Sequence, residues 1–398
     1  MGERGRQAEA LDVLAPFLAT GWWTATVTAA ELLEGWGRIE EAIEVTRARM
    51  ALGHPMALES YARLLARHGR AEEAFTLLVP HVDDGCLAHA LVDIAQDAGR
   101  DEEAAVLLAA RIPAGHRCDS PWCCRGLDSD TAIGLLATIR ERQGRVDEAV
   151  SLLRNRSITS VNGCDQLADL LARHGRIAEL RACATADTYG HAAQRLAELL
   201  EERGDVEGAI AVYQPGDRPA PQGANSAYRF ARLLARHGRG GEAIDVMRAQ
   251  ADAYPRDDWI LHALADLCLG QGRPRDGLAH LDDLKARRGG EEEWELFWMR
   301  LPLIAASAGV DEAVEAARAH PKGDTWYAAE HIAELLADAG RTEEAVAALQ
   351  RHAPADCHAL AGYLIDLGRV DDAVAVLQQN GSRPPQPATG PWHDEPPF

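Results

Sequence analysis

The sequence predicts an all-α protein, a solenoid of about twelve helix–turn–helix repeats, and three observations predict this fold. A glycine recurs at a mean interval of 33 residues through the 398-residue chain. Apolar residues before the glycine follow helical spacing, as in Tyr61, Leu64 and Leu65. The apolar residues are mostly Ala, Leu and Val, and only 5% of all residues are aromatic, a composition that suits closely packed helices better than sheets.

One short string marks each repeat, and its copy at residues 66–74 reads ARHGRAEEA. The glycine of this string stands at Gly5, Gly37, Gly69, Gly99, Gly144, Gly175, Gly204, Gly238, Gly272, Gly309, Gly340 and Gly368. Arg follows it in ten of the twelve copies, and a small residue stands five positions after it in ten of the twelve. We expect the glycine to end one helix in the left-handed conformation and the acidic pair to lie in the first turn of the next helix. The small residue is expected to let two helices approach closely.

These repeats resemble the tetratricopeptide repeat, a unit of about 34 residues with a glycine between its helices and an alanine five residues later. One copy places the following residues on the signature positions of that family: Leu58, Tyr61, Ala62, Leu65, Gly69, Ala74 and Leu78. Residues 161–176 also resemble repeat proteins common in actinobacteria. The general resemblance extends from residue 1 to about residue 380. It implies a right-handed α-solenoid whose first helices line a concave, partner-binding groove.

Departures from the regular spacing define the organisation of the chain. Residues 1–380 form the predicted solenoid, and the Pro-rich residues 381–398 are expected to be a disordered tail. A cysteine-containing loop at about 112–128 lies in the longest interval between repeat glycines, 45 residues, and a second loop is predicted at 213–224. Because only four residues precede the first repeat glycine, the chain begins with the second helix of a repeat. That end is either an oligomer contact or a frayed end, and the oligomeric state stays open.

Charge and motif content exclude several classes of function. The net charge of −21 argues against nucleic acid and anionic membranes as partners, since both are bound through clustered cations. No apolar run of about 18 residues occurs, so no membrane span is expected. Without an export signal, we expect the protein in the cytoplasm with its eight cysteines reduced. The motifs HExxH, GxxxxGKS/T and GxSxG are absent, and a GxGxxA at 238–243 coincides with a repeat turn, so neither enzymatic activity nor a cofactor is predicted.

One loop carries residues that could hold zinc: His116, Cys118, Cys123 and Cys124. Three thiols and an imidazole are a suitable tetrahedral set for this metal. The adjacent cysteines do not match the C-x2-C spacing, in which the two-residue gap lets both sulfurs turn toward one ion. This spacing favours a loop of reduced cysteines, with one or two packed under Trp122, and a zinc site is the second interpretation.

The resemblance also implies which side chains line the groove, since the fifth and ninth positions of each first helix point into it. At these positions, together with His191, stand His89 and Asp93, Asp165 and Asp169, Gln194 and Glu198, Tyr228 and Arg232, His262 and Asp266, and Glu330 and Glu334. A His and an Asp four residues apart share one helix face. Such pairs could bind a cation or a basic peptide, act as acid and base, or simply be solvated.

Aromatic residues are concentrated in the last third of the chain. Trp259, Trp326 and Tyr327 begin first helices near the rim of the predicted groove, where they either anchor a partner or pack internally. Trp298 falls on the structural Trp position of the family and is expected to pack between helices. The three histidines that precede a repeat glycine are expected to be structural, at helix C-termini where a cation is favoured.

The sequence therefore predicts a scaffold or adaptor that holds a protein or peptide, with basic segments, in the groove of its solenoid. Its partner would be a regulator, a signalling peptide or a complex assembled on the scaffold. The alternative is a metal-binding sensor or an enzyme in which the inserted cysteine loop lies near the groove.

Overall fold

The computed structural model describes residues 7–50, 55–112, 126–156, 161–186, 190–214, 223–290, 292–352 and 357–381. These residues form α-helices joined by short turns, as predicted, and no β-strand; an isolated bridge joins Asp84 to Gly126. None of the helices in these ranges is long and apolar enough to cross a membrane. The chain divides into two compact units, Met1–Ala209 (unit 1) and Ile210–Phe398 (unit 2).

In each unit, a first helix precedes the repeat glycine and a second helix follows it. The first helices of unit 1 are α2 (Trp23–Gly35), α4 (Pro55–Arg67), α6 (Gly85–Asp97), α8 (Ser129–Arg142), α10 (Val161–Arg173) and α12 (His191–Glu202). Its second helices are α1 (Gln7–Ala19), α3 (Ile39–Met50), α5 (Ala71–Leu78), α7 (Asp101–Ala109), α9 (Val146–Arg154) and α11 (Ile177–Ala186). A 3-10 helix, η2 (Val79–His81), follows α5, and α13 (Val206–Tyr213) runs across the boundary between the units.

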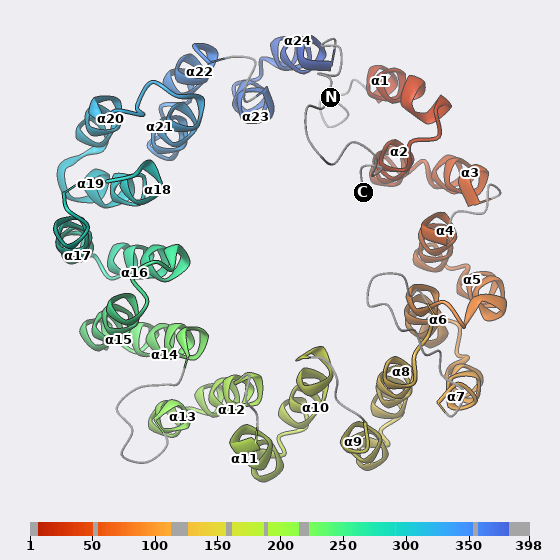
Figure 1. Cartoon of the computed structure of the whole chain (residues 1–398). Helices are drawn as coiled ribbons and strands as arrows, with labels where there is room; N and C mark the ends of the chain where they lie inside the picture. Colours follow the sequence, from red (N-terminus) through yellow and green to blue (C-terminus); the bar gives the residue numbers. More distant parts are fainter. Residues whose placement is uncertain are drawn as a thin grey trace, which may run out of the picture. The chain divides into compact units, whose positions relative to one another are not determined.

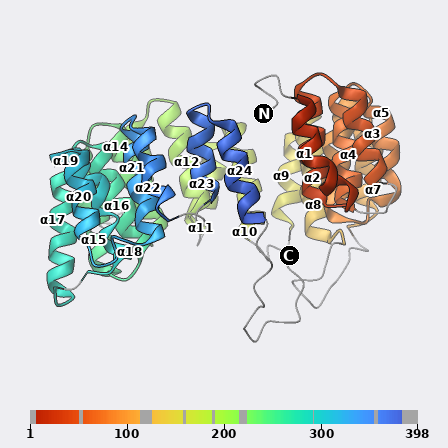
Figure 2. The ribbon, with the colours of Figure 1, turned by 90° about the horizontal axis from the view of Figure 1, so that it is seen from above.

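The same alternation continues in unit 2. Its first helices are α14 (Ala224–Arg236), α16 (Asp258–Gly270), α18 (Trp294–Phe297) with α19 (Arg300–Ala308), α21 (Trp326–Asp338) and α23 (Cys357–Asp366). Its second helices are α15 (Gly240–Ala253), α17 (Pro274–Arg287), α20 (Val310–Ala319), α22 (Thr342–Gln350) and α24 (Val370–Gly381). Figures 1 and 2 show the helices of each unit side by side, and consecutive first helices such as α4 and α6 or α16 and α19 contact each other. The side of each unit that they line is called the first-helix face.

The repeat glycine ends the first helix as predicted. Every repeat glycine among the described residues has a positive φ, and Gly5 lies outside them. In ten of these turns the residue after the glycine donates its N–H to the carbonyl five residues earlier, as Arg70 does to Leu65 at 2.9 Å. This bond satisfies a carbonyl that a helix end leaves unpaired. The exception is Gly309, at φ 110° and ψ 158°, where α20 begins at the next residue.

The small residue five positions after the glycine is buried where helices cross, also as predicted. Ala42, Ala74 and Ala149 are fully buried. A Cβ added at Gly277 of α17 would lie 3.0 Å from the Leu303 side chain of α19, which shows how closely these helices approach. Where the residue at this position is not small, the helix crossing accommodates a larger side chain. Leu180 of α11, for example, is fully buried.

The core of each unit lies between its first and second helices. In unit 1 a cluster of buried residues extends from Leu33 of α2 to Ile139 of α8. In unit 2 another extends from Trp294 of α18 to Ala373 of α24. Each helix buries an apolar stripe against its neighbours, so the core closes only when repeats stack.

In five turns of the described chain the arginine after the glycine joins consecutive repeats, a role that the sequence pattern alone did not indicate. Arg100 pairs with Glu103 of its own helix and, through Nη1 at 2.9 Å, with Glu72 of the preceding second helix. Arg341 pairs in the same way with Glu344 of its own helix and with the preceding second helix. The first-turn carboxylates therefore complement the helix N-terminus and also bridge repeats. Because these pairs are exposed, each contributes little to stability.

Two histidines that precede a repeat glycine have the structural role predicted for them. His68 Nε2 lies 2.8 Å from Glu34 Oε1, and Arg67 donates two hydrogen bonds to the same carboxylate. His174 repeats this contact with Glu141 of α8 at 3.0 Å. In both cases the end of one first helix is tied to the end of the preceding first helix.

Candidate binding surface on the first helices

Every groove residue identified in the sequence lies on a first helix. Helix α6 carries His89 and Asp93, α10 carries Asp165 and Asp169, α12 carries His191, Gln194 and Glu198, α14 carries Tyr228 and Arg232, α16 carries Trp259, His262 and Asp266, and α21 carries Trp326, Tyr327, Glu330 and Glu334. These helices belong to two units, and within each unit the side chains form separate groups.

On α6, His89 and Asp93 bind different partners. His89 Nδ1 lies 2.8 Å from the carbonyl oxygen of Gly85, one turn earlier in the same helix. Asp93 accepts a hydrogen bond from Arg63 of α4, with Nη1 and Oδ2 2.9 Å apart. Asp93 thus links two first helices, and the two side chains are not arranged as an acid–base pair.

A charged network joins α10 to α12 in unit 1. His191 lies between two carboxylates, with Nε2 3.2 Å from Asp169 Oδ1 and Nδ1 3.8 Å from Asp165 Oδ1. Arg195, which the sequence interpretation missed, has its Nε 2.8 Å from the same Asp169 oxygen and also pairs with Glu198. Its position three residues before a glutamate on the same helix is the signal that could have identified it. Asp169 and Glu198 therefore pair with the guanidinium group of Arg195, which leaves less negative charge for a partner.

In unit 2, the rings of three consecutive first helices form one continuous group, called the aromatic–histidine surface. Its members are His262 of α16, Trp294, Phe297 and Trp298 in and next to α18, His320 before α21, and Tyr327 and His331 of α21. Trp298 lies between two imidazoles, with its ring centroid 4.8 Å from that of His262 and 4.7 Å from that of His331. The rings of Trp298 and His331 are parallel to within 3°, which is a stacked arrangement.

Trp294 is the buried centre of this surface, with 3% of the residue exposed. Its ring centroid lies 5.2 Å from that of His320, 6.0 Å from Tyr327 and 6.1 Å from His331. Trp298, which was predicted to pack between helices, does so half-buried at the surface. Trp294 occupies the core position instead, and the repeat pattern did not show which of the two tryptophans would be buried.

A break in the ninth first helix positions both indoles. Helix α18 ends at Phe297 and α19 begins at Arg300. Pro302 has no N–H to donate to the carbonyl of Trp298, four residues earlier. The N–H of Leu301 donates to that carbonyl instead, at 3.1 Å. The proline is thus the sequence feature that makes this first helix irregular.

A buried ion network holds the segment before Trp294. Arg300, 7% exposed, donates through Nε to Glu292 at 2.5 Å and through Nη1 to Asp282 of α17 at 2.7 Å. Lys285 Nζ lies 3.3 Å from the second oxygen of Glu292. Because buried charges must be paired, this network fixes the start of α18 against α17 and α19.

Two exposed indoles flank the aromatic–histidine surface. Trp259, in the first turn of α16, is 40% exposed, and its ring meets Tyr228 of α14 edge-on at 6.2 Å. Trp326, in the first turn of α21, is 48% exposed and lies 5.6 Å from Tyr327. Arg232 Cζ lies 5.8 Å from the Tyr228 ring centroid, a cation–π contact within the chain.

Carboxylates border the two imidazoles beside Trp298. His262 Nδ1 lies 3.1 Å from Asp266 Oδ2, and His331 Nδ1 lies 3.4 Å from Glu334 Oε2. Each carboxylate orients its imidazole and adds negative charge beside Trp298. The surface thus combines flat aromatic faces with hydrogen-bond acceptors.

The residues of the predicted zinc set, His116, Cys118, Cys123 and Cys124, lie outside the described residues. The described residues on either side of these candidates are joined by a hydrogen bond, in which Ser129 Oγ donates to the carbonyl of Ile112 at 2.7 Å. In the part of the chain that the structure describes, no group of three or more His, Cys, Asp or Glu side chains is arranged to hold a metal ion.

Comparison with known proteins agrees with the repeat architecture. Residues 132–161, which include most of α8 and all of α9, match the tetratricopeptide repeat family. No curated protein matches the sequence. Yeast Tom70 is similar in structure, with a TM-score of 0.36 at 10% identity over 91% of this chain and 92% of that chain.

Two further solved structures are similar. A tetratricopeptide repeat protein of Parabacteroides merdae has a TM-score of 0.29 at 17% identity, over 62% of this chain and 94% of that chain. The structure of Naa15/Naa10 bound to HypK has a TM-score of 0.37 at 14% identity; the match covers 94% of this chain and only 66% of that chain. The family match thus covers one repeat, and the rest of the described chain consists of helical hairpins of the same helix–turn–helix kind.

Proposed function

We propose that this chain is a scaffold that holds a protein or peptide segment against the first-helix face of unit 2. The observation that carries the proposal is the pair of exposed indoles, Trp259 and Trp326, on the first and last helices of the aromatic–histidine surface. Tryptophan is the residue type most enriched among binding hot spots. Large apolar side chains bordered by polar groups also mark interaction sites on otherwise hydrophilic surfaces.

The proposed partner carries basic segments. Asp266 and Glu334 place carboxylates beside the two histidines that contact Trp298, and the chain as a whole has a net charge of −21. Positive groups are attracted to such a surface over long range and make cation–π contacts with its rings. In this proposal the chain catalyses no reaction and needs no cofactor, and its partner is a regulator or a component of an assembly.

Peptides selected by phage display on the wild-type protein test this proposal. In a variant with both Trp259→Ala and Trp326→Ala, we expect the selected peptide to bind about thirtyfold more weakly, as for the loss of hot-spot tryptophans. Trp22→Ala is the matched control, because Trp22 is 55% exposed but lies in unit 1. Isothermal titration calorimetry measures the affinities, and unchanged binding to the double variant would contradict the proposal.

Metal analysis of the purified protein tests the alternative, a metal-binding sensor or enzyme. One equivalent of zinc or iron that is lost in Cys118→Ser or Cys123→Ser would support the alternative. Protein that is free of metal and still binds the selected peptides would support the scaffold.

A further inference from the structure

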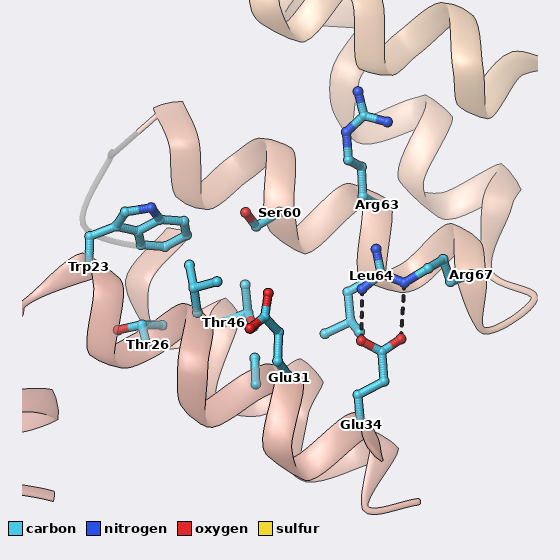
Figure 3. Close-up of a pocket in the computed structure, with 11 residues that line it drawn as sticks. Trp23, Thr26, Glu31, Glu34, Thr46, Ser60, Arg63, Leu64 and Arg67 are labelled. Atoms are coloured by element: carbon cyan, nitrogen blue, oxygen red, sulfur yellow. Dashed lines mark hydrogen bonds and ion pairs between the residues drawn. The ribbon is translucent and has the colours of Figure 1, made fainter. Parts of the chain in front are cut away.

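A small pocket opens on the first-helix face of unit 1, between α2 and α4, with α3 behind them. Its volume is about 140 Å³. Helix α2 contributes Trp23, Thr26 and Glu31 to its lining, α3 contributes Thr46 and α4 contributes Ser60 (Figure 3). The pocket lies within unit 1, so what it binds is independent of the surface proposed above for unit 2.

Two buried hydroxyls line the bottom of the pocket. Thr26 and Thr46 are 1% and 2% exposed, and by the exposure of the whole residue only two other polar or charged residues in the described ranges are buried. Thr46 Oγ1 donates to the carbonyl of Ala42 at 2.8 Å, and Thr26 Oγ1 donates to that of Trp22 at 3.5 Å. Because each hydroxyl has used its only proton, its oxygen can offer a ligand nothing but lone pairs. The bottom of the pocket therefore favours a ligand that donates hydrogen bonds.

The two arginines at the edge of the pocket already have anionic partners. Arg67 donates two hydrogen bonds to Glu34, at 3.0 and 2.8 Å, which Figure 3 marks with dashed lines. Arg63 binds Glu59 and Asp93, each at 2.9 Å. The positive charge of these guanidinium groups is therefore compensated, and neither is available to hold an anion in the pocket.

Glu31 and Ser60 are the polar groups of the pocket that remain. Within the described residues, neither side chain has an ion pair or a hydrogen bond. Figure 3 shows both side chains directed into the space beside the Trp23 indole. Glu31 thus gives the pocket one uncompensated negative charge, next to an aromatic wall.

We propose that this pocket binds the guanidinium group of an arginine side chain from a partner peptide. A planar guanidinium can stack on the Trp23 indole while it donates two parallel hydrogen bonds to the Glu31 carboxylate. Its other N–H groups meet the acceptor oxygens of Ser60 and the two threonines. A lysine ammonium has three donors on one atom and no flat face, so it satisfies fewer of these groups at once.

Fluorine NMR of the full chain labelled with 5-fluorotryptophan reports on occupancy of the pocket. The signal of Trp23 is assigned by its loss in Trp23→Phe. The probe is a blocked glycine–arginine–glycine peptide, and the comparison peptides carry lysine or citrulline, the neutral isostere of arginine, at the central position. We expect a saturable shift of the Trp23 signal with the arginine peptide, at least about threefold weaker binding with lysine, and no shift with citrulline.

Substitutions on neighbouring helices distinguish a specific contact with Glu31 from a general effect of the negative charge of the chain on peptide binding. Glu31→Gln keeps the size of the side chain and is expected to weaken binding of the arginine peptide at least about tenfold. Glu40→Gln removes the same charge from an exposed residue of α3 outside the pocket and is expected to leave the affinity unchanged. Thr46→Val removes the acceptor at the bottom of the pocket with little change of shape and is also expected to weaken binding. Equal binding of the lysine or citrulline peptide, or unchanged affinity in Glu31→Gln, would overturn the proposal.

Discussion

The first helices of the two units are joined to their neighbours by different contacts, although the same repeat turn builds both. In unit 1 the contacts are ion pairs, such as that between Arg63 of α4 and Asp93 of α6. In unit 2 they are ring contacts: Trp298 stacks on His331 of α21 and makes a tilted contact with His262 of α16. Exposed ion pairs are weak and screened by salt, whereas ring contacts depend on burial and packing.

This difference shows which parts of the repeat are constrained. The positive-φ glycine and the buried small residue recur in both units because they set the turn and the helix crossing. The side chains on the first-helix face follow no such repeat. One framework can therefore present an arginine pocket in unit 1 and an aromatic surface in unit 2.

The largest expected difference between the units concerns the arginines of their two charge networks. Arg300→Met leaves Glu292, whose side chain is 6% exposed, with Lys285 in place of its guanidinium partner, so we expect the free energy of unfolding of unit 2 to fall by about 2–3 kcal/mol. Arg195→Met in unit 1 is expected to cost about 1 kcal/mol or less, because the side chains of Arg195 and Asp169 are 30% and 36% exposed.

Urea unfolding measures these losses, and hydrogen exchange resolved by peptide assigns each loss to one unit. Arg100→Met, at an exposed repeat turn of unit 1, is a control for the loss of a guanidinium whose carboxylate partners are exposed. Equal losses in Arg300→Met and Arg195→Met would remove the distinction between a buried network in unit 2 and an exposed one in unit 1.

The turns could be predicted from the sequence because their cause is local. A glycine in the left-handed conformation, followed by an acidic first turn, defines the end of one helix and the start of the next within a few residues. The repetition of a histidine before the glycine predicted a structural role for His68, but it did not identify Glu34 of the preceding first helix as its partner. The break between α18 and α19 could also have been predicted, since Pro302 has no N–H to continue the helical hydrogen bonds.

The contacts of the candidate surfaces could not be predicted in the same way. They depend on which side chains neighbouring helices place opposite each other, and spacing along one helix does not contain that information. Asp93 pairs with Arg63 of another helix rather than with His89 of its own. Arg195 enters its network partly because α10 brings Asp169 beside it. The placement of the zinc candidates lies outside the described residues, so that hypothesis stays a prediction.

Acidification is expected to weaken unit 2 before unit 1. Burial lowers the pKa of His280 in α17 from its usual 6.5, so the unfolded chain binds the proton more tightly than the folded chain. The neutral His280 therefore contributes fully to the stability of unit 2 above about pH 6.5, and this contribution is lost as the pH falls below that value. Hydrogen bonds from Arg67 and Arg173 lower the pKa values of Glu34 and Glu141 from 4.5, so the contribution of these carboxylates to unit 1 is lost only below about pH 4.5.

Urea midpoints measured from about pH 7 to about pH 4, with hydrogen exchange to separate the units, test this order. His280→Gln removes the titrating group and is expected to flatten the pH dependence of unit 2 between about pH 7 and about pH 5. Glu141→Gln is the matched variant for unit 1 and is expected to change the profile only in the more acidic range. An unchanged profile of unit 2 in His280→Gln would show that another group causes its acid sensitivity.

The smallest effects concern single contacts between first helices, and double-mutant cycles resolve them. We expect a coupling energy of about 0.5 kcal/mol between Arg67 and Glu34 in unit 1, which falls in about 1 M NaCl because the charges are partly exposed. Between Trp298 and His331 in unit 2 we expect about 1 kcal/mol, unchanged by salt. Urea unfolding of the single and double alanine variants at low and high salt gives both values. If both couplings fell equally in salt, the Trp298–His331 contact would be mainly electrostatic, and the contrast between an ion-paired and a ring-packed face would fail.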